Sequence, residues 1–433
     1  MLQKPKGTYD VYGEKGKKIL YIEKLLKALM EKYNYEYFRT PLFESSELFH
    51  RGVGETSDIV SKETYDFLDR GERKLTLRPE GTAGIVRSYI ENKMYGDNGL
   101  VKAWYFGPMY RYERPQSGRY REFYQFGVEA FGSLDPGLDA EIISIPVNFY
   151  KLLGLKGIKV KINSLGDTAS RIKYKEALCN HFEKHLDQLC DDCKTRFEKN
   201  PLRILDCKVD HDLEIMKSAP KLIDYLNEES RNHFELVQKY LQAMNIEYEI
   251  DNYLVRGLDY YTHTVFEVEA NVEGFGSQNV LCAGGRYNEL VETLGGPSIS
   301  GVGFAFGLER LLVALEYENL KPYDDEFLDF YIIPVDLNEK AYPLNILNML
   351  RMNGFNGDMD YMNRSLKSCF KYCDKINPKY IIIIGEDEVN SKVLSVRKNE
   401  TKEEYKIKED EIIDFFDSNM WGSYEENKYR RFK

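Results

Sequence analysis

Apolar residues near the start of the chain recur three or four positions apart. They run from Ile19 through Leu26 to Tyr33, and this spacing forms one face of an amphipathic helix. From Leu75 to Phe131 the pattern changes to an alternation with period two, punctuated by glycine and proline. Such alternation is typical of antiparallel strands with one polar face. The sequence therefore predicts a helix followed by a sheet.

This sheet is predicted to be interrupted by a helical insertion at about residues 167–250. Helical spacing returns there, and runs of β-branched residues are rare. Strand-like sequence with glycines resumes from Tyr253 to Ala305, and the segment from Gly307 to Leu315 predicts a helix. We therefore expect an α+β domain whose antiparallel sheet is completed after the insertion.

A second domain is predicted beyond a linker at residues 316–326, which contains Asn, Pro and two Asp. Apolar runs at residues 330–335 and 380–384 are separated by segments with helical spacing. Strands that alternate with helices predict a small α/β sheet that is buried on both faces. The expected domains are residues 1–325, with the insertion inside them, and residues 326–433.

Composition narrows the classes of function. The chain has 433 residues, 42% hydrophobic and 30% charged, and no apolar run approaches the roughly 20 residues of a membrane helix. Seven cysteines with mostly irregular spacing do not suggest a disulfide scaffold. The first ten residues are not followed by the apolar segment of a secretory signal. We therefore expect a cytoplasmic protein with no membrane role.

The net charge of −11 repels polyanions, so any contact with RNA has to be local. Residues 328–433 hold 17 Lys and Arg against 19 Asp and Glu, so most of the negative charge lies before them. This difference permits a basic face in the second domain, and a small basic cluster closes the chain at Lys428, Arg430, Arg431 and Lys433. A solvated tail explains that cluster equally well.

The two strands predicted within residues 105–131 carry polar side chains and glycines on one face. Arg111 follows this face at the end of the first strand, and Gln125 and Glu129 lie on it in the second. The other face is almost wholly apolar, so these three side chains are expected to converge over one floor. The connecting loop holds further charged residues: Glu113, Arg114, Arg119 and Arg121. Guanidinium groups grip phosphate oxygens in pairs, but cross-strand ion pairs explain the same charges equally well.

A second segment packs Arg256, Tyr260 and Tyr261 into six residues. Arg256 beside Gly257 can bring charge and backbone close to a ligand, while the tyrosines present hydroxyl groups on flat apolar rings. His263 follows closely and is a candidate catalyst. A lone histidine in a strand is, however, more often structural.

Two glycine-containing segments follow. Ala283-Gly-Gly-Arg-Tyr287 is predicted to form a tight loop against a ligand, although paired glycines alone are a weak signal. The segment from Gly301 to Arg310 is a glycine-punctuated strand that runs into a helix. From the first helical turn, Arg310 could reach a terminal phosphate.

Potential metal ligands lie in the predicted insertion. Cys190-Asp-Asp-Cys193 is followed by Cys207 and His211, a spacing that could build a Cys₃His zinc site. A pair of surface cysteines at a helix end is the more common explanation of the first two. Both interpretations stay open at this stage.

Several of these segments together resemble the signatures of class II aminoacyl-tRNA synthetases. The similar segments are Leu77-Arg-Pro-Glu-Gly-Thr-Ala83, the strand and loop with Arg111, and Gly307-Leu-Glu-Arg310. The segments Arg256-Gly-Leu-Asp-Tyr-Tyr261 and Ala283-Gly-Gly-Arg-Tyr287 match two that are peculiar to the histidyl-tRNA synthetase family. Order and spacing agree from Lys6 to about Leu315. The second domain corresponds to the family's α/β anticodon-binding domain by pattern only.

The resemblance implies a class II catalytic domain with a helical insertion, acting as an ATP-dependent histidine–tRNA ligase. In the family, the carboxylate of histidine attacks the α-phosphorus of ATP, and the acyl group then passes to the terminal adenosine of tRNA(His). Arg111 and Arg256 would hold the α-phosphate, and Arg310 with Mg²⁺ would hold the β and γ phosphates. Glu113 and Arg119 would also contact ATP.

The resemblance also implies a histidine-binding set: Glu80, Gly81, Thr82, Gln125, Glu129, Arg256, Tyr260 and Tyr261. Glu80, Thr82 and Gln125 would receive the α-amino group, and Arg256 would meet the carboxylate. Glu129 and Tyr261 would hydrogen-bond the two imidazole nitrogens. A site that bonds both nitrogens rejects other amino acids by up to roughly 10⁴-fold, so no editing domain is expected.

Two rival classes remain to be weighed. A non-catalytic, histidine-sensing regulatory subunit with the same fold usually lacks the anticodon domain and erodes the Arg256 segment, whereas this chain keeps both. A pure RNA-binding module is disfavoured by the acidic first 327 residues and by arginines suited to ATP. The family further implies a homodimer whose interface includes Thr40-Pro-Leu-Phe-Glu44.

Overall fold

The chain divides into two compact units, residues 1–323 and residues 324–433. The computed structural model describes residues 2–420 except 55–56, 58, 98, 206, 208, 211, 256–257, 259, 272–278 and 322–327. Each unit has its own hydrophobic core. All residues expected to bind histidine or ATP belong to the first unit.

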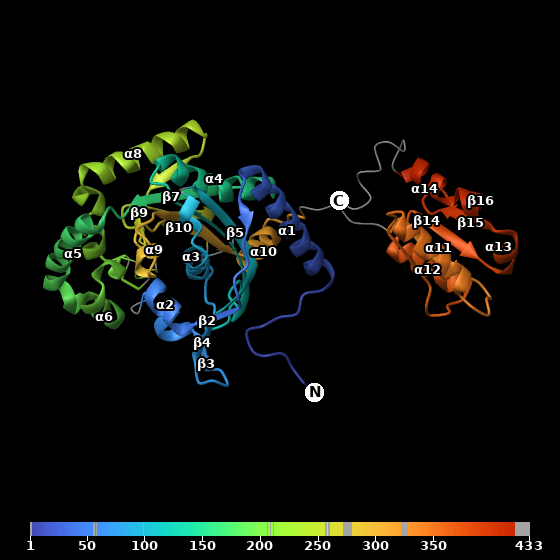
Figure 1. Ribbon diagram of the computed structural model, residues 1–433, viewed down its shortest axis with the longest axis horizontal. Helices are drawn as coiled ribbons and strands as arrows, with labels where there is room; N and C mark the ends of the chain where they lie inside the picture. Colours follow the sequence, from blue (N-terminus) through green and yellow to red (C-terminus); the bar gives the residue numbers. More distant parts are fainter. Residues whose placement is uncertain are drawn as a thin grey trace. The chain divides into compact units, whose positions relative to one another are not determined.

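The described strands of the first unit include an eight-stranded sheet in the order β1-β5-β6-β11-β10-β9-β7-β8 (Figure 1). Its inner pairs are antiparallel, and the outermost pairs, β1–β5 and β7–β8, are parallel. The bounds are β1 Glu36–Tyr37, β5 Val101–Tyr110, β6 Glu122–Phe131, β7 Ile158–Ser164, β8 Tyr248–Ile250, β9 Thr262–Ala270, β10 Val280–Arg286 and β11 Gly301–Gly307. Because β6 pairs with β11, residues about 180 positions apart share one floor.

The alternation between Leu75 and Phe131 is not strand throughout. A small sheet in the order β2-β4-β3 ends at Leu77, and a helix follows before β5. The bounds are β2 Phe43–Ser45, β3 Tyr65–Leu68, β4 Lys74–Leu77 and α3 Thr82–Glu91. The carboxylate of Glu80 accepts hydrogen bonds from the amides of Thr82 and Ala83, which caps the start of α3. The continuous strand pattern predicted for this stretch is therefore wrong at α3.

Helices cover one face of the large sheet: α1 Gly13–Tyr33, α4 Pro136–Leu152, α8 Glu228–Ala243 and α10 Leu308–Tyr317. In this layer Leu26 of α1 and Leu311 of α10 belong to the same buried cluster as Phe126 and Phe304 of the sheet. The helices predicted near residues 19–33 and 307–315 are confirmed as α1 and α10. They occupy this face, so ligands can approach only the opposite one.

The opposite face carries α3 and most of the segment expected as the helical insertion, whose last helix, α8, covers the first face. This segment holds α5 Thr168–Phe182, α6 Asp191–Lys199 and α7 Glu214–Lys217, together with short 3₁₀ turns. Two further short helices, α2 Ser46–Val53 and α9 Leu290–Thr293, lie beside α3. A second core joins Tyr105 and Phe131 of the sheet with Tyr89 of α3 and Leu178 of α5. The insertion is thereby tied to the sheet.

The second unit is a five-stranded sheet with helices. Its strands lie in the order β13-β12-β14-β15-β16, with β12 parallel to both neighbours. The bounds are β12 Phe330–Pro334, α11 Ala341–Met352, β13 Gly357–Met359, α12 Leu366–Ile376, β14 Tyr380–Ile384, α13 Glu386–Ser391, β15 Val393–Lys398, β16 Glu404–Lys408 and α14 Ile412–Met420. Ile332 and Tyr331 of β12 belong to different buried clusters, so this strand is buried on both faces as predicted.

The antiparallel strands β15 and β16 were not predicted from the sequence. The basic cluster at residues 428–433 lies outside the described residues. Within the described part of the chain, no helix combines the length and the hydrophobicity that crossing a membrane requires.

Candidate active site

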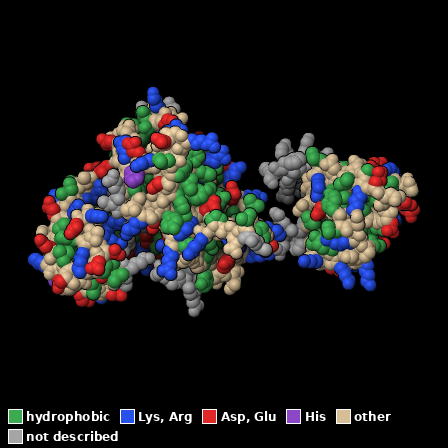
Figure 2. Space-filling model, turned by 90° about the horizontal axis from the view of Figure 1, so that it is seen from below, with side chains coloured by type: hydrophobic (Ala, Val, Ile, Leu, Met, Phe, Trp, Pro, Cys, Tyr) green, Lys and Arg blue, Asp and Glu red, His purple; other side chains and the backbone are tan. Residues whose placement is uncertain are grey.

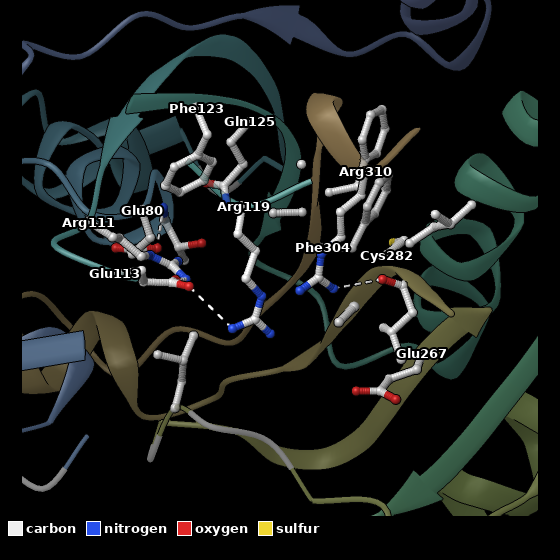
Figure 3. A pocket seen from close by; sticks show the side chains of 18 of the residues that line it. Glu80, Arg111, Glu113, Arg119, Phe123, Gln125, Glu267, Cys282, Phe304 and Arg310 are labelled. Carbon is white, nitrogen blue, oxygen red and sulfur yellow. Dashed lines mark hydrogen bonds and ion pairs between the residues drawn. The ribbon is translucent and has the colours of Figure 1, made fainter. Parts of the chain in front are cut away.

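A pocket of about 720 Å³ lies on the sheet face opposite α1 and α10, a size suited to a small-molecule site (Figure 3). Strands β6, β9, β10 and β11, the loop that follows β5, the starts of α3 and α10 and part of the insertion supply its walls. It is lined by most of the residues singled out in the sequence: Glu80, Thr82, Arg111, Glu113, Arg119, Gln125, Glu129, Tyr260, Tyr261 and Arg310. The expected convergence of Arg111, Gln125 and Glu129 over one floor is therefore found.

Small residues create the floor of this pocket. Glu129 on β6 lies between Ala103 of β5 and Gly303 of β11 in the sheet register. A Cβ atom on Gly303 would lie 1.9 Å from a carboxylate oxygen of Glu129, and one on Gly127 would lie 2.2 Å from the ring of Tyr105. The glycines noted on the polar face are thus needed for space, so that larger side chains can stand on the sheet.

Glu129 is almost fully buried, with an exposed fraction of 1%. One carboxylate oxygen accepts a hydrogen bond from the hydroxyl of Thr82 at 2.6 Å, and the other accepts one from the hydroxyl of Tyr287. Burial raises the pKa of Glu129 to about 8, against the opposing effect of these two donors, and the nearby Glu80 raises it further. Glu129 is therefore a hydrogen-bonding group whose protonation state can change near neutral pH.

The raised pKa of Glu129 predicts a pH dependence of stability. The unfolded carboxyl group releases its proton near its ordinary pKa of 4.5, whereas the folded one keeps it to about 8. Between these values the folded state binds more protons, so raising the pH lowers the free energy of unfolding by at most about 1.4 kcal/mol per pH unit. In Glu129→Gln this contribution is absent. As the pH rises from about 5 to about 8, the unfolding temperature of the wild type should therefore fall relative to that of the variant. A difference in unfolding temperature that does not change with pH would contradict the prediction.

Three tyrosines stand around Glu129. Tyr260 and Tyr261 line the pocket with ring centroids 4.6 Å apart, and Tyr287 lies 5.6 Å from the ring of Tyr260. Tyr261 was expected beside Glu129 from the family pattern, while Tyr287 was not assigned a role. The sequence feature that could have pointed to Tyr287 is its membership of the Ala283–Tyr287 segment, which was predicted to lie against a ligand.

The segment Ala283–Tyr287 is a strand and not the predicted tight loop. Residues 283–286 belong to β10, which pairs with both β9 and β11. A Cβ atom on Gly284 would lie 2.3 Å from the carbonyl oxygen of Gly303, so glycine here permits close strand packing. Arg286 is fully buried in an ion pair with Asp139 and donates to the carbonyl of Ser133 at 2.7 Å. The segment's arginine is structural, and its tyrosine reaches the pocket.

Residues at the start of α3 and the side chains they contact form a second polar cluster in the pocket. The amide of Gly81 and the hydroxyl of Tyr105 both donate to Oε1 of Gln125, each at 3.2 Å. Glu80 is buried, which raises its pKa, and its carboxylate accepts from the α3 amides. The residues expected around an α-amino group, Glu80, Thr82 and Gln125, are therefore held at one place by backbone and side-chain hydrogen bonds.

Four guanidinium groups line the same pocket: those of Arg111, Arg119 and Arg310, and that of Arg196 from the insertion. Glu113 lies between two of them, 3.8 Å from Nη1 of Arg111 and 3.2 Å from Nη1 of Arg119 (Figure 3). Arg310 donates from Nη1 to the carbonyl of Val280 at 2.9 Å. Burial lowers the pKa of Arg310 to about 10, and the charges of Arg119 and Arg111 lower it further, although Glu113 opposes them. Such crowding of positive charge favours a bound polyanion.

The charged loop contains the ion pairs that one of its two interpretations expected, and binding of phosphate by its arginines stays a prediction. Arg111 and Arg119 do pair with Glu113, and Nε of Arg111 donates to the carbonyl of Pro79 at 2.8 Å. Arg114 is exposed, and Arg121 stacks on Tyr112 with 3.8 Å from Cζ to the ring centroid. Neither of these two lines the pocket, so the loop contributes one arginine to it and not three.

His263 lies apart from the pocket lining. Its ring is 5.6 Å from that of His233, and its backbone has a φ of 44°. Burial lowers the pKa of His263 to about 4, and the charges of His233 and Arg286 lower it further. The structural interpretation of His263 therefore fits the structure better than the catalytic one. Arg256, with Gly257 and Asp259, lies outside the described residues.

The insertion also borders the pocket, through Asp192, Arg196, Cys207 and Val209. This contact was not predicted, because helical spacing does not reveal which other element a helix face will meet.

The mostly antiparallel sheet, with helices on one face and a polar pocket on the other, has the fold of a class II aminoacyl-tRNA synthetase. Residues 7–311 match the family model described as histidyl-tRNA synthetase, and residues 329–419 match an anticodon binding domain. The chain belongs to the histidyl-tRNA synthetase family, whose members are histidine–tRNA ligases.

Histidine–tRNA ligases from other organisms are similar to this chain along nearly its whole length. The histidine–tRNA ligase of Anoxybacillus flavithermus is 51% identical over 94% of this chain and 96% of its own. That of Bacillus licheniformis is 49% identical over 96% and 98%. The crystal structure of apo histidyl-tRNA synthetase from S. aureus aligns with a TM-score of 0.82 and 43% identity, covering 96% of this chain and all of that one.

A further solved structure shares the fold alone. It is titled as an ATP phosphoribosyltransferase regulatory subunit/histidyl-tRNA synthetase from Bacillus halodurans. It aligns with a TM-score of 0.64 at 22% identity, over 89% of this chain and 98% of that one.

Proposed function

We propose that this pocket activates histidine with ATP, releasing pyrophosphate, and then transfers the histidyl group to the 3′ end of tRNA(His). One observation carries the proposal: a buried carboxyl group among tyrosines and a cluster of guanidinium groups line the same pocket. Carboxyl and hydroxyl groups suit the two nitrogens of an imidazole ring, and guanidinium groups suit a triphosphate. Within one pocket, the carboxylate of histidine can reach the α-phosphorus of ATP.

The residues on the sheet at the bottom of the pocket, together with those at the start of α3, recognise histidine. Glu129 and Tyr261 bond the ring nitrogens, and Tyr260 packs beside them. Glu80, Thr82 and Gln125, with the Gly81 backbone, surround the α-amino group. The support for these roles is that each of these side chains lines the pocket and that Thr82 already donates to Glu129.

Adenylate formation develops negative charge on phosphate oxygens, which fixed cations stabilise. Arg111 and Arg256 hold the α-phosphate, and Arg256 also meets the histidine carboxylate. Arg119 and Arg310 hold the outer phosphates, with Glu113 orienting Arg119. Three of these arginines line the pocket, and the role of Arg256 rests on the family pattern.

Use of ATP follows from the family, and we propose Mg²⁺ as its counter-ion. Mg²⁺ prefers oxygen ligands and often combines one or two carboxylates with substrate phosphates. Glu113 and Glu267 are carboxylates that line the pocket together with the arginines, and they would hold the ion. When bound, Mg²⁺ neutralises charge on the pyrophosphate that leaves.

We also propose that the enzyme is a cytoplasmic homodimer. Exposed hydrophobic side chains gather on the elements near the Thr40–Glu44 segment: Tyr37, Leu42, Phe43, Phe67 and Leu68. Figure 2 views the molecule from the side of β2, β3 and β4 and has hydrophobic side chains gathered on that face. A contiguous exposed patch of this kind favours burial against a second copy.

The alternative is a non-catalytic regulatory subunit that senses histidine. The presence of arginines suited to ATP beside the histidine residues, and of the anticodon-binding domain, favours catalysis instead.

Exchange of radiolabelled pyrophosphate into ATP, measured with each of the twenty amino acids, tests the proposed reaction. We expect exchange with histidine and rates at the background level with the others. Charging of purified tRNA by the same protein separates a ligase from a sensor. A chain that binds histidine but supports neither reaction would be the regulatory subunit.

A further inference from the structure

Three thiols and one carboxylate converge in the insertion, and the reaction on histidine and ATP uses none of them. Cys190 and Cys193 lie at the start of α6, whereas Cys207 and Asp210 follow the 3₁₀ turn Pro201–Ile204. One potential ligand atom from each of the four residues lies within 4.8 Å of the others. The sequence suggested His211 as the fourth member. His211 lies outside the described residues, and Asp210 is found beside the thiols.

The spacing of the sulfur atoms fits a common central ion. Ligand atoms about 2.3 Å from a tetrahedral zinc ion lie about 3.8 Å from one another. The Sγ atoms of Cys190 and Cys207 are 3.8 Å apart. A disulfide would require about 2.05 Å between them. The cluster therefore has nearly the dimensions of a zinc site, and the ligand atoms that lie farthest apart would move slightly closer together on binding the ion.

The burial of these ligand residues also favours a bound metal ion. Cys193 has no exposed surface, and the exposed fractions of Cys207 and Asp210 are 5% and 4%. A buried carboxylate is costly unless it is hydrogen-bonded or paired with a cation. Asp210 accepts a hydrogen bond from the amide of Cys190 at 3.0 Å and also interacts with the three thiols, but among the described residues no lysine or arginine forms an ion pair with it. A dication between the carboxylate and the thiols would supply the missing charge.

The backbone also favours thiolates at this place. Cys190 is the N-terminal cap of α6, a nine-residue helix whose N-terminus favours negative charge. The amide of Asp210 donates to Sγ of Cys207 at 3.4 Å. Donors aimed at sulfur stabilise the deprotonated form that binds metal.

We propose that Cys190, Cys193, Cys207 and Asp210 hold a structural zinc ion. Thiolate ligands favour zinc among the common divalent ions, and four protein ligands without a water position are typical of structural sites.

The ion would fix one wall of the active-site pocket. Asp192 and Arg196 of α6, and Cys207 and Val209 of the second segment, line that pocket. Zinc would join the two segments that carry these residues, which lie 14 positions apart between Cys193 and Cys207. Removing it should therefore lower the unfolding temperature of the enzyme and loosen this wall.

Elemental analysis of the full-length, untagged protein, purified from zinc-supplemented cells without chelators, tests the proposal. We expect about one zinc ion per chain in the wild type. Cys193→Ser should lose the zinc and unfold at a lower temperature. Cys179→Ser is the matched control, because Cys179 lies in α5 of the same insertion but outside the cluster. This control should keep the zinc and the wild-type unfolding temperature.

Two further variants identify the fourth ligand. Asp210→Asn should lose zinc or bind it more weakly, whereas His211→Ala should retain it. The reverse result would overturn the assignment of Asp210. Should Cys193→Ser fail to fold, exchange of the wild-type metal for Co²⁺ decides the question through thiolate-to-cobalt absorption bands. Wild-type protein without metal, or with a Cys190–Cys207 disulfide, would overturn the proposal.

Discussion

Replacing Glu129 with alanine is expected to lower kcat/KM for histidine in pyrophosphate exchange by about 10²- to 10⁴-fold. The substitution removes an acceptor for the imidazole ring. It also leaves the hydroxyls of Thr82 and Tyr287 without their partner in a buried site. The KM for ATP should change little, because the arginines that bind phosphate are untouched. Steady-state exchange over a range of histidine and ATP concentrations separates the two effects.

Two variants control the Glu129 experiment. Glu122→Ala lies on the same strand outside the pocket lining and should keep wild-type kinetics. Glu129→Gln keeps the shape of the side chain but cannot ionise, so it distinguishes a loss of recognition from a loss of folding. Wild-type histidine kinetics in Glu129→Ala would end the assignment of this residue to imidazole recognition.

Replacing Arg111 with alanine is expected to slow adenylate formation by about 10²- to 10³-fold, with a smaller effect on the KM for histidine. Its guanidinium group is held at Nε by the carbonyl of Pro79, which orients the terminal nitrogens toward a fixed place. Charge on the α-phosphate increases in the transition state, so the loss should fall mainly on kcat. Single-turnover formation of the adenylate measures this step directly.

Arg256→Ala should have a similar effect if both arginines act on one phosphorus atom. The double variant would then lose less activity than the product of the two single losses, because the groups act together. Arg114→Ala is the matched control, since Arg114 is an exposed arginine of the same loop that does not line the pocket. Fully multiplicative losses would show that Arg111 and Arg256 act at separate places.

Local pattern predicted much of the architecture. Helical spacing gave α1 and α10, and apolar runs gave β12 and β14, because each of these elements buries one side or both sides along its own length. The interval from Leu75 to Phe131 was predicted less well. There the hydrogen bonds from Thr82 and Ala83 to Glu80 start a helix that the alternation did not reveal.

In the candidate site, too, some features could be predicted from local pattern and others could not. The period of two along a strand placed Gln125 and Glu129 on one face, and this needs no knowledge of neighbouring strands. The sequence could not place Tyr287 beside Glu129, because that contact depends on the pairing of β6 with β11 and of β11 with β10. The misassigned loop at Ala283–Tyr287 has the same origin, since its glycines serve strand packing.

The sequence by itself indicated the kind of protein, because several of its segments resemble the signatures of one family in order and spacing, and local spacing predicted the faces of its strands. Only the tertiary structure decided which side chains meet: Tyr287 with Glu129, Arg286 with Asp139, and Asp210 with the three thiols. These partners lie between 3 and 158 positions apart and come together through sheet pairing and helix packing. Periodicity along one segment carries no information about such contacts, which explains why they emerged only from the folded chain.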